Sequence, residues 1–363
     1  MVLLVYLLIT SILYFLLIIF FIKGWKKLPD FIPGKSNKNI LSVSVVIPCH
    51  NEEKNLPSLF EALSVQTYQD FELLLINDHS TDATESIIKN HLPIFKNAVY
   101  FSSKEKGKKK ALQEAIELAK GELIITTDAD CTPSNKWIET IIDFYSQQSC
   151  DLIIGPVKMK NDSSFFQRLQ TLEFVSLIAT GAATAASGKP ILCNGANFAF
   201  LKKSFLESKN DLHEEELSGD DIFLLQSIKK RKGKIQFLKS TEAFVETQPC
   251  KTIVEFFKQR KRWASKAKTY RDKFTVFIAL LVFLMCFNIL VLLIVSIMQP
   301  IFWKIFVMVF IFKYLLDAGF LATVSNFFSL ENVWLDAFFL SLFYPFYVVL
   351  VGLAGIVFKQ KKW

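Results

Sequence analysis

The stretch GELIITTDADC, residues 121–131, decides how we interpret the rest of the chain. Its residues 123–127 are apolar or β-branched, as is typical of a buried strand, and two carboxylates follow at Asp128 and Asp130. In an extended segment, side chains two residues apart point to the same side, so both carboxylates can approach one hard cation. The pattern predicts a site for Mg²⁺ or Mn²⁺ at the carboxyl end of a strand. The alternative is an ordinary polar turn, because turns favour Asp.

The composition indicates a membrane protein. Of the 363 residues, 52% are hydrophobic and 14% are aromatic, with 36 Phe, which is more apolar than two soluble domains would be. The six cysteines form no CxxC pair, and this spacing is typical of reduced cytosolic thiols. The net charge of +8 is concentrated beside apolar runs and in two short clusters, which favours an anionic membrane surface and a phosphate-bearing substrate over nucleic acid.

The amino-terminal segment has the features of an uncleaved membrane anchor. Residues 1–22 carry no charge, which is enough chain to cross a hydrocarbon core of about 30 Å. Lys23, Lys26 and Lys27 follow, so we expect the amino terminus outside and the next part of the chain in the cytoplasm. A cleaved signal peptide would have basic residues in front and a small-residue cleavage site behind. Residues 23–41 are then a predicted linker.

Residues 42–247 alternate between strand and helix patterns, which predicts an α/β domain with a mostly parallel sheet and flanking helices. The predicted strands cover residues 43–48, 71–78, 99–102, 123–127 and 151–158, and the predicted helices cover residues 55–65, 80–90, 109–119 and 165–179. The small residues of 181–190, GAATAASGKP, fit either a loop that orders on substrate binding or a linker. Ligands of such a sheet bind at the carboxyl ends of its strands.

Polar segments follow these strands. Asp78 ends the second strand, and its acceptor-only carboxylate suits the imide N–H of uracil or a ribose hydroxyl. The alternative is an Asx turn or a helix cap. The lysine-rich run KEKGKKKAL, residues 104–112, precedes a predicted helix, where it can offer N–H groups and positive charge to a diphosphate. A solvated charge run is the other interpretation.

In this order, the segments resemble the family 2 glycosyltransferases, which have the GT-A fold. The resemblance rests on VSVVIPCHNEE, FELLLINDHSTD, KGKKKALQEAI and GELIITTDAD, and it continues through GANFAF, SGDDIFLL and QRKRW (residues 195–200, 218–225 and 259–263). It covers about residues 42–265. The QxxRW pattern marks the membrane-embedded branch that includes cellulose, hyaluronan and poly-N-acetylglucosamine synthases and ceramide glucosyltransferases.

The resemblance implies a role for each matching residue of the donor site. Asp78 would bind the uracil end of a nucleotide-sugar, in a pocket that Pro48 and Glu52 also line. Asp128 and Asp130 would be the DxD pair that holds the metal, with Asp128 also near the nucleotide. Asn77 stands where Asp is commoner, which puts the nucleotide contacts in doubt.

It also implies which residues carry the transfer. Asp221 would be the catalytic base, although Asp220 replaces the commoner Glu beside it, and a helix cap is the alternative role of Asp220. Contacts with the diphosphate and the acceptor would come from Lys108 and from the QxxRW residues Gln259, Arg262 and Trp263. A base is needed because the pKa of an acceptor hydroxyl is far above 7. Attack from the face opposite the leaving group would invert the anomeric centre.

The carboxyl-terminal third is predicted to associate with the membrane. Residues 248–272 form a basic amphipathic segment, which fits an interfacial helix as well as an ordinary positive flank. Residues 273–363 contain three predicted spans, and the second carries Lys313 and Asp317 on one helix face. The span count puts the carboxyl terminus outside, whereas the basic tail KQKKW indicates the inside. A re-entrant hairpin would satisfy both.

Together these features predict an integral protein of the plasma or inner membrane whose catalytic domain is cytoplasmic. We expect a metal-dependent inverting glycosyltransferase that moves a sugar from a UDP-sugar to a lipid or glycan acceptor near the bilayer. A processive polysaccharide synthase is the first alternative, and a catalytically inactive membrane scaffold is the second.

Overall fold

The computed structural model describes residues 2–34, 41–160, 164–211, 219–265 and 272–357. The chain divides into two compact units. Among the described residues, the sheet unit lies within 28–160 and 184–248, and the helical unit lies within 2–27, 164–183 and 249–357. The predicted domain 42–247 therefore differs from the sheet unit, because residues 161–183 are grouped with the helical unit.

A seven-stranded sheet forms the centre of the sheet unit, in the order β3-β2-β1-β4-β8-β6-β9. Its strands are β1 (Val43–Cys49), β2 (Glu72–Asn77), β3 (Ala98–Ser102), β4 (Leu123–Thr126), β6 (Leu152–Ile154), β8 (Phe198–Leu201) and β9 (Ile235–Phe237). The strands β3, β2, β1 and β4 pair in parallel, whereas β8 is antiparallel to both neighbours. Every residue of β1 is buried, as expected for a parallel strand covered on both faces. The predicted mostly parallel α/β architecture is confirmed.

A second sheet contains three short strands, β5 (Cys131–Pro133), β10 (Val245–Thr247) and β7 (Val157–Met159). It corrects the prediction of one strand over residues 151–158, because that segment is shared between β6 in the large sheet and β7 in the small one. The break is at Gly155, where a Cβ atom would lie 2.2 Å from the Asn197 side chain. The buried amide of Asn197 donates to the carbonyls of Pro156 and Ala243, so it holds the break in place.

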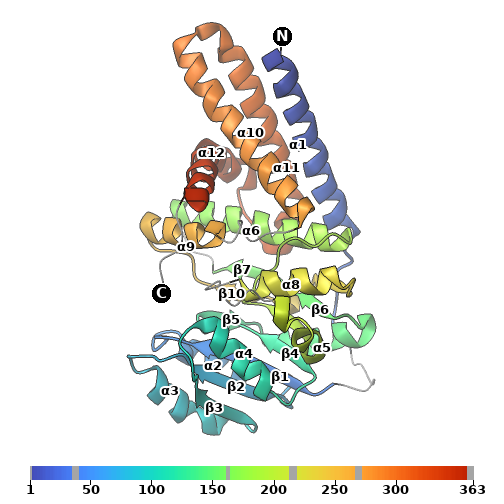
Figure 1. The fold of residues 1–363 in the computed structure, drawn as a ribbon, viewed down its shortest axis with the longest axis vertical. Helices are drawn as coiled ribbons and strands as arrows, with labels where there is room; N and C mark the ends of the chain where they lie inside the picture. Colours follow the sequence, from blue (N-terminus) through green and yellow to red (C-terminus); the bar gives the residue numbers. More distant parts are fainter. Residues whose placement is uncertain (1, 35–40, 161–163, 212–218, 266–271, 358–363) are drawn as a thin grey trace. The chain divides into compact units, whose positions relative to one another are not determined.

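The helices of the sheet unit are α2 (Leu56–Ser64), α3 (Thr84–His91), α4 (Lys108–Leu118), α5 (Trp137–Gln148), α7 (Lys202–Leu206) and α8 (Asp220–Lys230), with short 3₁₀ turns at Leu92–Ile94, Lys209–Asp211 and Thr241–Ala243. The predicted helices over residues 55–65, 80–90 and 109–119 are present as α2, α3 and α4, whereas α5 and α7 were not predicted (Figure 1). The apolar residues of α2 recur at helical spacing and are buried, which is why the sequence predicts this helix well.

The helical unit contains α1 (Val2–Lys27), α6 (Phe165–Ala186, of which the last three residues are grouped with the sheet unit), α9 (Ile253–Ser265), α10 (Lys273–Met298), α11 (Trp303–Phe328) and α12 (Val333–Val357). A 3₁₀ turn at Pro300–Phe302 separates α10 from α11, as the proline predicts. Among the described residues, α1, α6, α10, α11 and α12 are long and apolar enough to cross a membrane. Helices α1, α10 and α11 run side by side, whereas α6 and α9 lie across them (Figure 1).

Two boundaries differ from the prediction. Helix α1 continues through Lys27 into the predicted linker, because lysine is a good helix former and can extend its charge towards water. Residues 35–40 of that linker lie outside the described part of the chain. Helix α6 continues to Ala186, so residues 181–186 are neither a loop nor a linker. Alanine has the highest helix propensity, and this outweighs the loop-like small side chains.

Candidate active site

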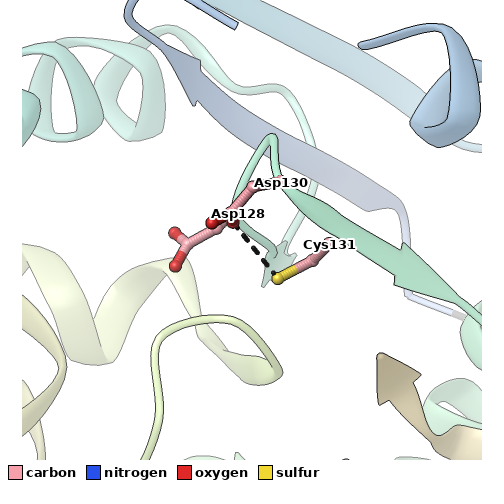
Figure 2. A group of neighbouring side chains, drawn as sticks. All are labelled: Asp128, Asp130 and Cys131. Carbon is pink, nitrogen blue, oxygen red and sulfur yellow. Dashed lines mark hydrogen bonds between the residues drawn. The ribbon is translucent and has the colours of Figure 1, made fainter. Parts of the chain in front are cut away.

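The acidic pair of the opening stretch lies in a tight turn. β4 ends at Thr126, and the N–H of Cys131 donates to the carbonyl of Asp128 across 3.2 Å. The segment is therefore not extended, and the prediction that an extended backbone aligns Asp128 with Asp130 was wrong. The turn itself brings the side chains together. The ligand atoms of Asp128, Asp130 and Cys131 lie within 4.8 Å of one another (Figure 2). Asp128 and Asp130 lie on the loop between β4 and β5, and Cys131 is the first residue of β5.

The chemistry of this cluster fits a hard divalent cation. Two carboxylates are the oxygen ligands that Mg²⁺ and Mn²⁺ prefer. Burial raises the pKa of the Cys131 thiol, and the carboxylates of Asp130 and Asp128 raise it further. The thiol therefore stays neutral at pH 7, whereas soft metals bind thiolate. Loss of hydration raises the pKa of Asp130, and the charge of Asp128 adds to this effect, so a cation here would relieve a repulsion.

Successive lysines at the start of α4 reach both acidic pairs. The Nζ atom of Lys108 lies 2.5 Å from Oδ1 of Asp128. Burial lowers the pKa of Lys108, but the carboxylates of Asp128, Asp220 and Asp130 more than reverse this, so the pKa is raised and the side chain is charged. The Nζ atom of Lys109 lies 3.9 Å from Oδ1 of Asp220. One turn of helix thus connects the proposed metal pair to the carboxylates of α8.

Asp221 is held at the edge of the sheet by backbone groups. Its Oδ2 accepts the N–H of Gly195 at 3.0 Å, and its Oδ1 accepts the N–H of Ile222 at 2.8 Å. The carbonyl of Gly195 in turn accepts the hydroxyl of Thr126, at the end of β4, at 3.1 Å. Asp221 is therefore connected through Gly195 to the end of β4, the strand that the turn with Asp128 and Asp130 follows. Ser218 of the same motif lies outside the described residues.

Asp78 organises the loop in front of α4. Its Oδ1 accepts the N–H of Gly107 at 2.8 Å, and Gly107 has φ +124°, a conformation that favours glycine. The alternative role predicted for Asp78 was to stabilise a turn. Asn77 has that role instead, because its Oδ1 accepts the N–H of Ser80 at 3.0 Å. At the start of α3, it is Asp82 that accepts the N–H of Thr84. Asp78 remains the acidic side chain buried beside the lysine-rich loop.

The two other predicted donor residues lie on β1 and just after it. Pro48 is a buried residue of β1, paired with Ile76 of β2. Burial raises the pKa of Glu52, and the charges of Asp130 and Asp128 raise it further, whereas a hydrogen bond from the Asn55 side chain lowers it. Glu52 thus belongs to the same electrostatic environment as the metal pair.

The QxxRW residues belong to the helical unit. Gln259, Arg262 and Trp263 all lie on α9, which is the helix predicted within residues 248–272. Oε1 of Gln259 accepts a hydrogen bond from Arg260 at 2.5 Å. The ring of Trp263 faces the guanidinium of Arg260, with its centroid 4.1 Å from Cζ. Residues 266–271, which complete the predicted segment, are not described.

Three residues with clear roles were not singled out from the sequence. Gly195 holds Asp221, Asn197 holds the break between β6 and β7, and Lys109 pairs with Asp220. Gly195 and Asn197 belong to the GANFAF segment, which the sequence analysis matched to the family without assigning roles to its single residues. Lys109 differs from its neighbouring lysines in being buried, and no feature of the run KGKKK marks that difference.

Comparison with known proteins defines the class. Residues 44–208 match the model of the family "Glycosyl transferase family 2". The chain therefore carries a family 2 glycosyl transferase domain, and the matched residues include Asp78, Lys108, Asp128 and Asp130.

Individual relatives agree with this assignment. The chain is 25% identical to the poly-β-1,6-N-acetyl-D-glucosamine synthase of Staphylococcus epidermidis over 250 residues, or 68% of this chain and 59% of that protein. It is 30% identical to the undecaprenyl-phosphate 4-deoxy-4-formamido-L-arabinose transferase of Aeromonas hydrophila over 138 residues, or 37% of this chain and 42% of that protein. The chain thus matches about half the length of these relatives.

A solved structure has a similar fold over nearly the whole chain. The mannosyltransferase PcManGT of Pyrobaculum calidifontis, solved with GDP-Man and Mn²⁺, aligns with a TM-score of 0.58 and 16% identity. The alignment covers 96% of each chain. At this identity the likeness concerns the fold, including helices beyond the sheet unit.

Proposed function

We propose that this protein is a membrane-bound inverting glycosyltransferase that moves a sugar from a UDP-sugar to a lipid or glycan acceptor at the cytoplasmic membrane face. The observation that supports this most is the pair of lysines on α4. Lys108 contacts the metal pair and Lys109 contacts Asp220, the neighbour of the base candidate. Transfer needs groups that bind the donor diphosphate and a carboxylate that takes the proton of the acceptor hydroxyl, and both must lie close to the reacting atoms.

The donor side follows from charge. Breaking the bond between the anomeric carbon and the diphosphate leaves negative charge on the leaving group. The positive side chain of Lys108 is positioned beside Asp128 to stabilise that charge, an effect typically worth several kcal/mol. Asp128 and Asp130 would hold Mg²⁺ or Mn²⁺, which neutralises the diphosphate oxygens when bound. Asp78, Pro48 and Glu52 would surround the nucleotide.

The acceptor side depends on Asp221. Its two hydrogen bonds come from backbone N–H groups, which fix the direction of the carboxylate. Each carboxylate oxygen keeps a second lone pair, so Asp221 can accept the proton of an acceptor hydroxyl. Attack on the face opposite the diphosphate would invert the anomeric centre. Gln259, Arg262 and Trp263 of α9 would border the diphosphate and the acceptor.

The acceptor class is supported by the helices and the relatives. In the described part of the chain, five helices are long and apolar enough to cross a membrane, and they would keep a lipid acceptor nearby. The Aeromonas hydrophila relative is named as a transferase to undecaprenyl phosphate, and the Staphylococcus epidermidis relative as a polysaccharide synthase. A processive synthase is the second candidate, because the match to that synthase covers 68% of this chain.

The test incubates membranes containing the protein with a panel of radiolabelled nucleotide-sugars, followed by extraction into organic solvent. The panel contains UDP-sugars, and it also contains GDP-mannose because Asn77 departs from the family pattern. We expect one donor to label a product, and Asp221→Asn to abolish the labelling. Glu85→Gln, in an exposed ion pair of α3, is the control and should keep full turnover. Unchanged labelling by Asp221→Asn would favour a different base, and no labelling with any donor would favour the scaffold. Product length on a gel separates single addition from polymerisation.

A further inference from the structure

Within the helical unit, a buried ion pair joins α6 to α9. The side chains of Glu173 and Arg260 are only 4% and 1% exposed. Arg260 Nε donates to Oε1 of Glu173 at 3.2 Å, and Nη2 donates to Oε2, so the pair is bidentate. Burying two charges is costly, and apolar residues of the same size often stabilise a fold equally well. A role beyond stability would explain why this pair is ionic.

The contacts of Arg260 indicate such a role. Its Nη1 donates to Oε1 of Gln259, and its guanidinium packs against the rings of Phe256 and Trp263, with centroids 4.6 Å and 4.1 Å from Cζ. Two of the three QxxRW residues are therefore in direct contact with one fixed guanidinium. Only arginine combines a planar fork for a carboxylate with faces that stack on aromatic rings.

Two further contacts orient this arrangement. The hydroxyl of Tyr347, on α12, donates to Oε1 of Glu173 at 3.3 Å. The side-chain amide of Gln170, one turn earlier on α6, makes two hydrogen bonds of 3.0 Å with the backbone of Cys250. Helix α6 therefore binds both the segment leading into α9 and the middle of that helix.

We infer that Glu173 and Arg260 are positioning residues, which set the side-chain directions of Gln259 and Trp263 for the diphosphate and the acceptor. The inference rests on the proposed function, because it takes the roles of these two residues from it. The structural effect can be tested without assuming that function, because α9 should lose its fixed geometry when the ion pair of Glu173 and Arg260 is broken.

The first experiment needs no turnover. Hydrogen exchange is measured on peptides from α9 in the full-length protein. Glu173→Gln removes the charge but keeps the shape, and we expect faster exchange in α9. The matched control is Asp336→Asn, which breaks the bidentate pair of Arg168 with Asp336 between α6 and α12. Faster exchange in α9 in both variants, or in neither, would overturn the inference.

The second experiment measures kcat and KM with the donor that the wild type uses. Arg260→Lys keeps the charge but not the fork or the stacking, so we expect kcat/KM to fall about 100-fold, the cost typical of a misplacement of about 1 Å. Asp336→Asn should stay within about threefold of the wild type, as expected away from the reacting groups. Full turnover by Arg260→Lys would show that charge neutralisation is enough, and would overturn the inference.

A double variant separates position from stability. Glu173→Met combined with Arg260→Met removes both buried charges and should unfold at or above the wild-type temperature. We expect its turnover to stay as low as that of Arg260→Lys although the fold is intact. Recovery of turnover together with stability would assign the pair a purely structural role. A wild type without turnover on any donor would count against the proposed function alone, because the exchange experiment still tests the pair.

Discussion

Asp220 and Asp221 begin the same helix but have different surroundings. Asp220 faces the buried ammonium of Lys109, which also lies over the ring of Phe223. Asp221 is bound only to backbone N–H groups in the contacts described above. We therefore expect Asp220→Asn to lower the free energy of unfolding by about 1–3 kcal/mol, because a buried cation loses an ionic partner. Thermal unfolding of the purified protein measures this.

The same pair of variants assigns the base. Asp221→Asn should lower the free energy of unfolding by about 1–3 kcal/mol, because its single amide oxygen can accept only one of the two backbone N–H groups. Its turnover should fall by about 10²-fold or more. Asp220→Asn should keep more turnover than Asp221→Asn at a temperature where both are folded. The reverse order would move the role of base to Asp220.

The metal pair leads to a second prediction. Burial raises the pKa of Asp130, and the charge of Asp128 raises it further even with Lys108 beside Asp128, so a divalent cation bound by both carboxylates would relieve a remaining repulsion. Burial also raises the pKa of the Cys131 thiol, which stays neutral. We expect chelation to abolish turnover, and Mg²⁺ or Mn²⁺ to restore it better than Zn²⁺, because carboxylate oxygens suit hard cations. Turnover is measured after dialysis against EDTA and after each ion is added back. Full activity in excess EDTA would contradict the assignment.

Sequence reasoning reached the charged residues of this site but not the groups that hold them. The order of strands predicts that Asp78, Asp128 and the residues after β1 share one edge, because parallel strands end together. It does not predict that Asp221 is fixed by the N–H of Gly195, because that contact depends on a loop. Neither does it predict the turn at Asp128, since Asp-Ala-Asp fits a strand end and a turn equally well.

Among the helices, α6 departs most from its sequence pattern. Its second half contains Gly and Ala, which were interpreted as forming a loop or a linker, yet one of these alanines lies against α1. At Gly24 a Cβ atom would lie 2.4 Å from the carbonyl oxygen of Ala183. Small side chains are what allow two membrane helices to approach this closely. The small residue at Ala183 is therefore explained by a neighbouring helix.

This close approach predicts opposite effects for two glycines. Gly24→Ala forces α1 away from the backbone of α6, so we expect a loss of about 1–3 kcal/mol, as for other overpacked sites. Gly319 of α11 has no atom within 4 Å of the corresponding position, so Gly319→Ala should be neutral or gain up to about 1 kcal/mol from helix propensity. Thermal unfolding in detergent compares the two. Equal melting temperatures would mean that α1 and α6 can separate freely.

In the helical unit, the direction of α12 relative to α11 decides how many of its helices can span the membrane in parallel. Trp334 and Tyr344 lie about 15 Å apart along α12 at the usual helical rise, yet both contact the turn of α11 at Lys313 and Tyr314. Two helices packed side by side would bring Tyr344 to a different turn of α11. Further along, Gly352 lies against Phe283 of α10. Helix α12 therefore crosses α11 at a large angle, although its length and composition would suit a membrane span.

This crossing resolves the conflict between span count and tail charge. If only α1, α10 and α11 span the bilayer, the chain after α11 returns to the side of the sheet unit, where the basic KQKKW sequence is expected. We therefore predict that a tag added after Trp363 lies on the same membrane face as the sheet unit, and that a tag before Met1 lies on the other. Protease protection in oriented vesicles measures both. A carboxyl-terminal tag on the same face as the amino-terminal tag would mean that α12 spans the membrane after all.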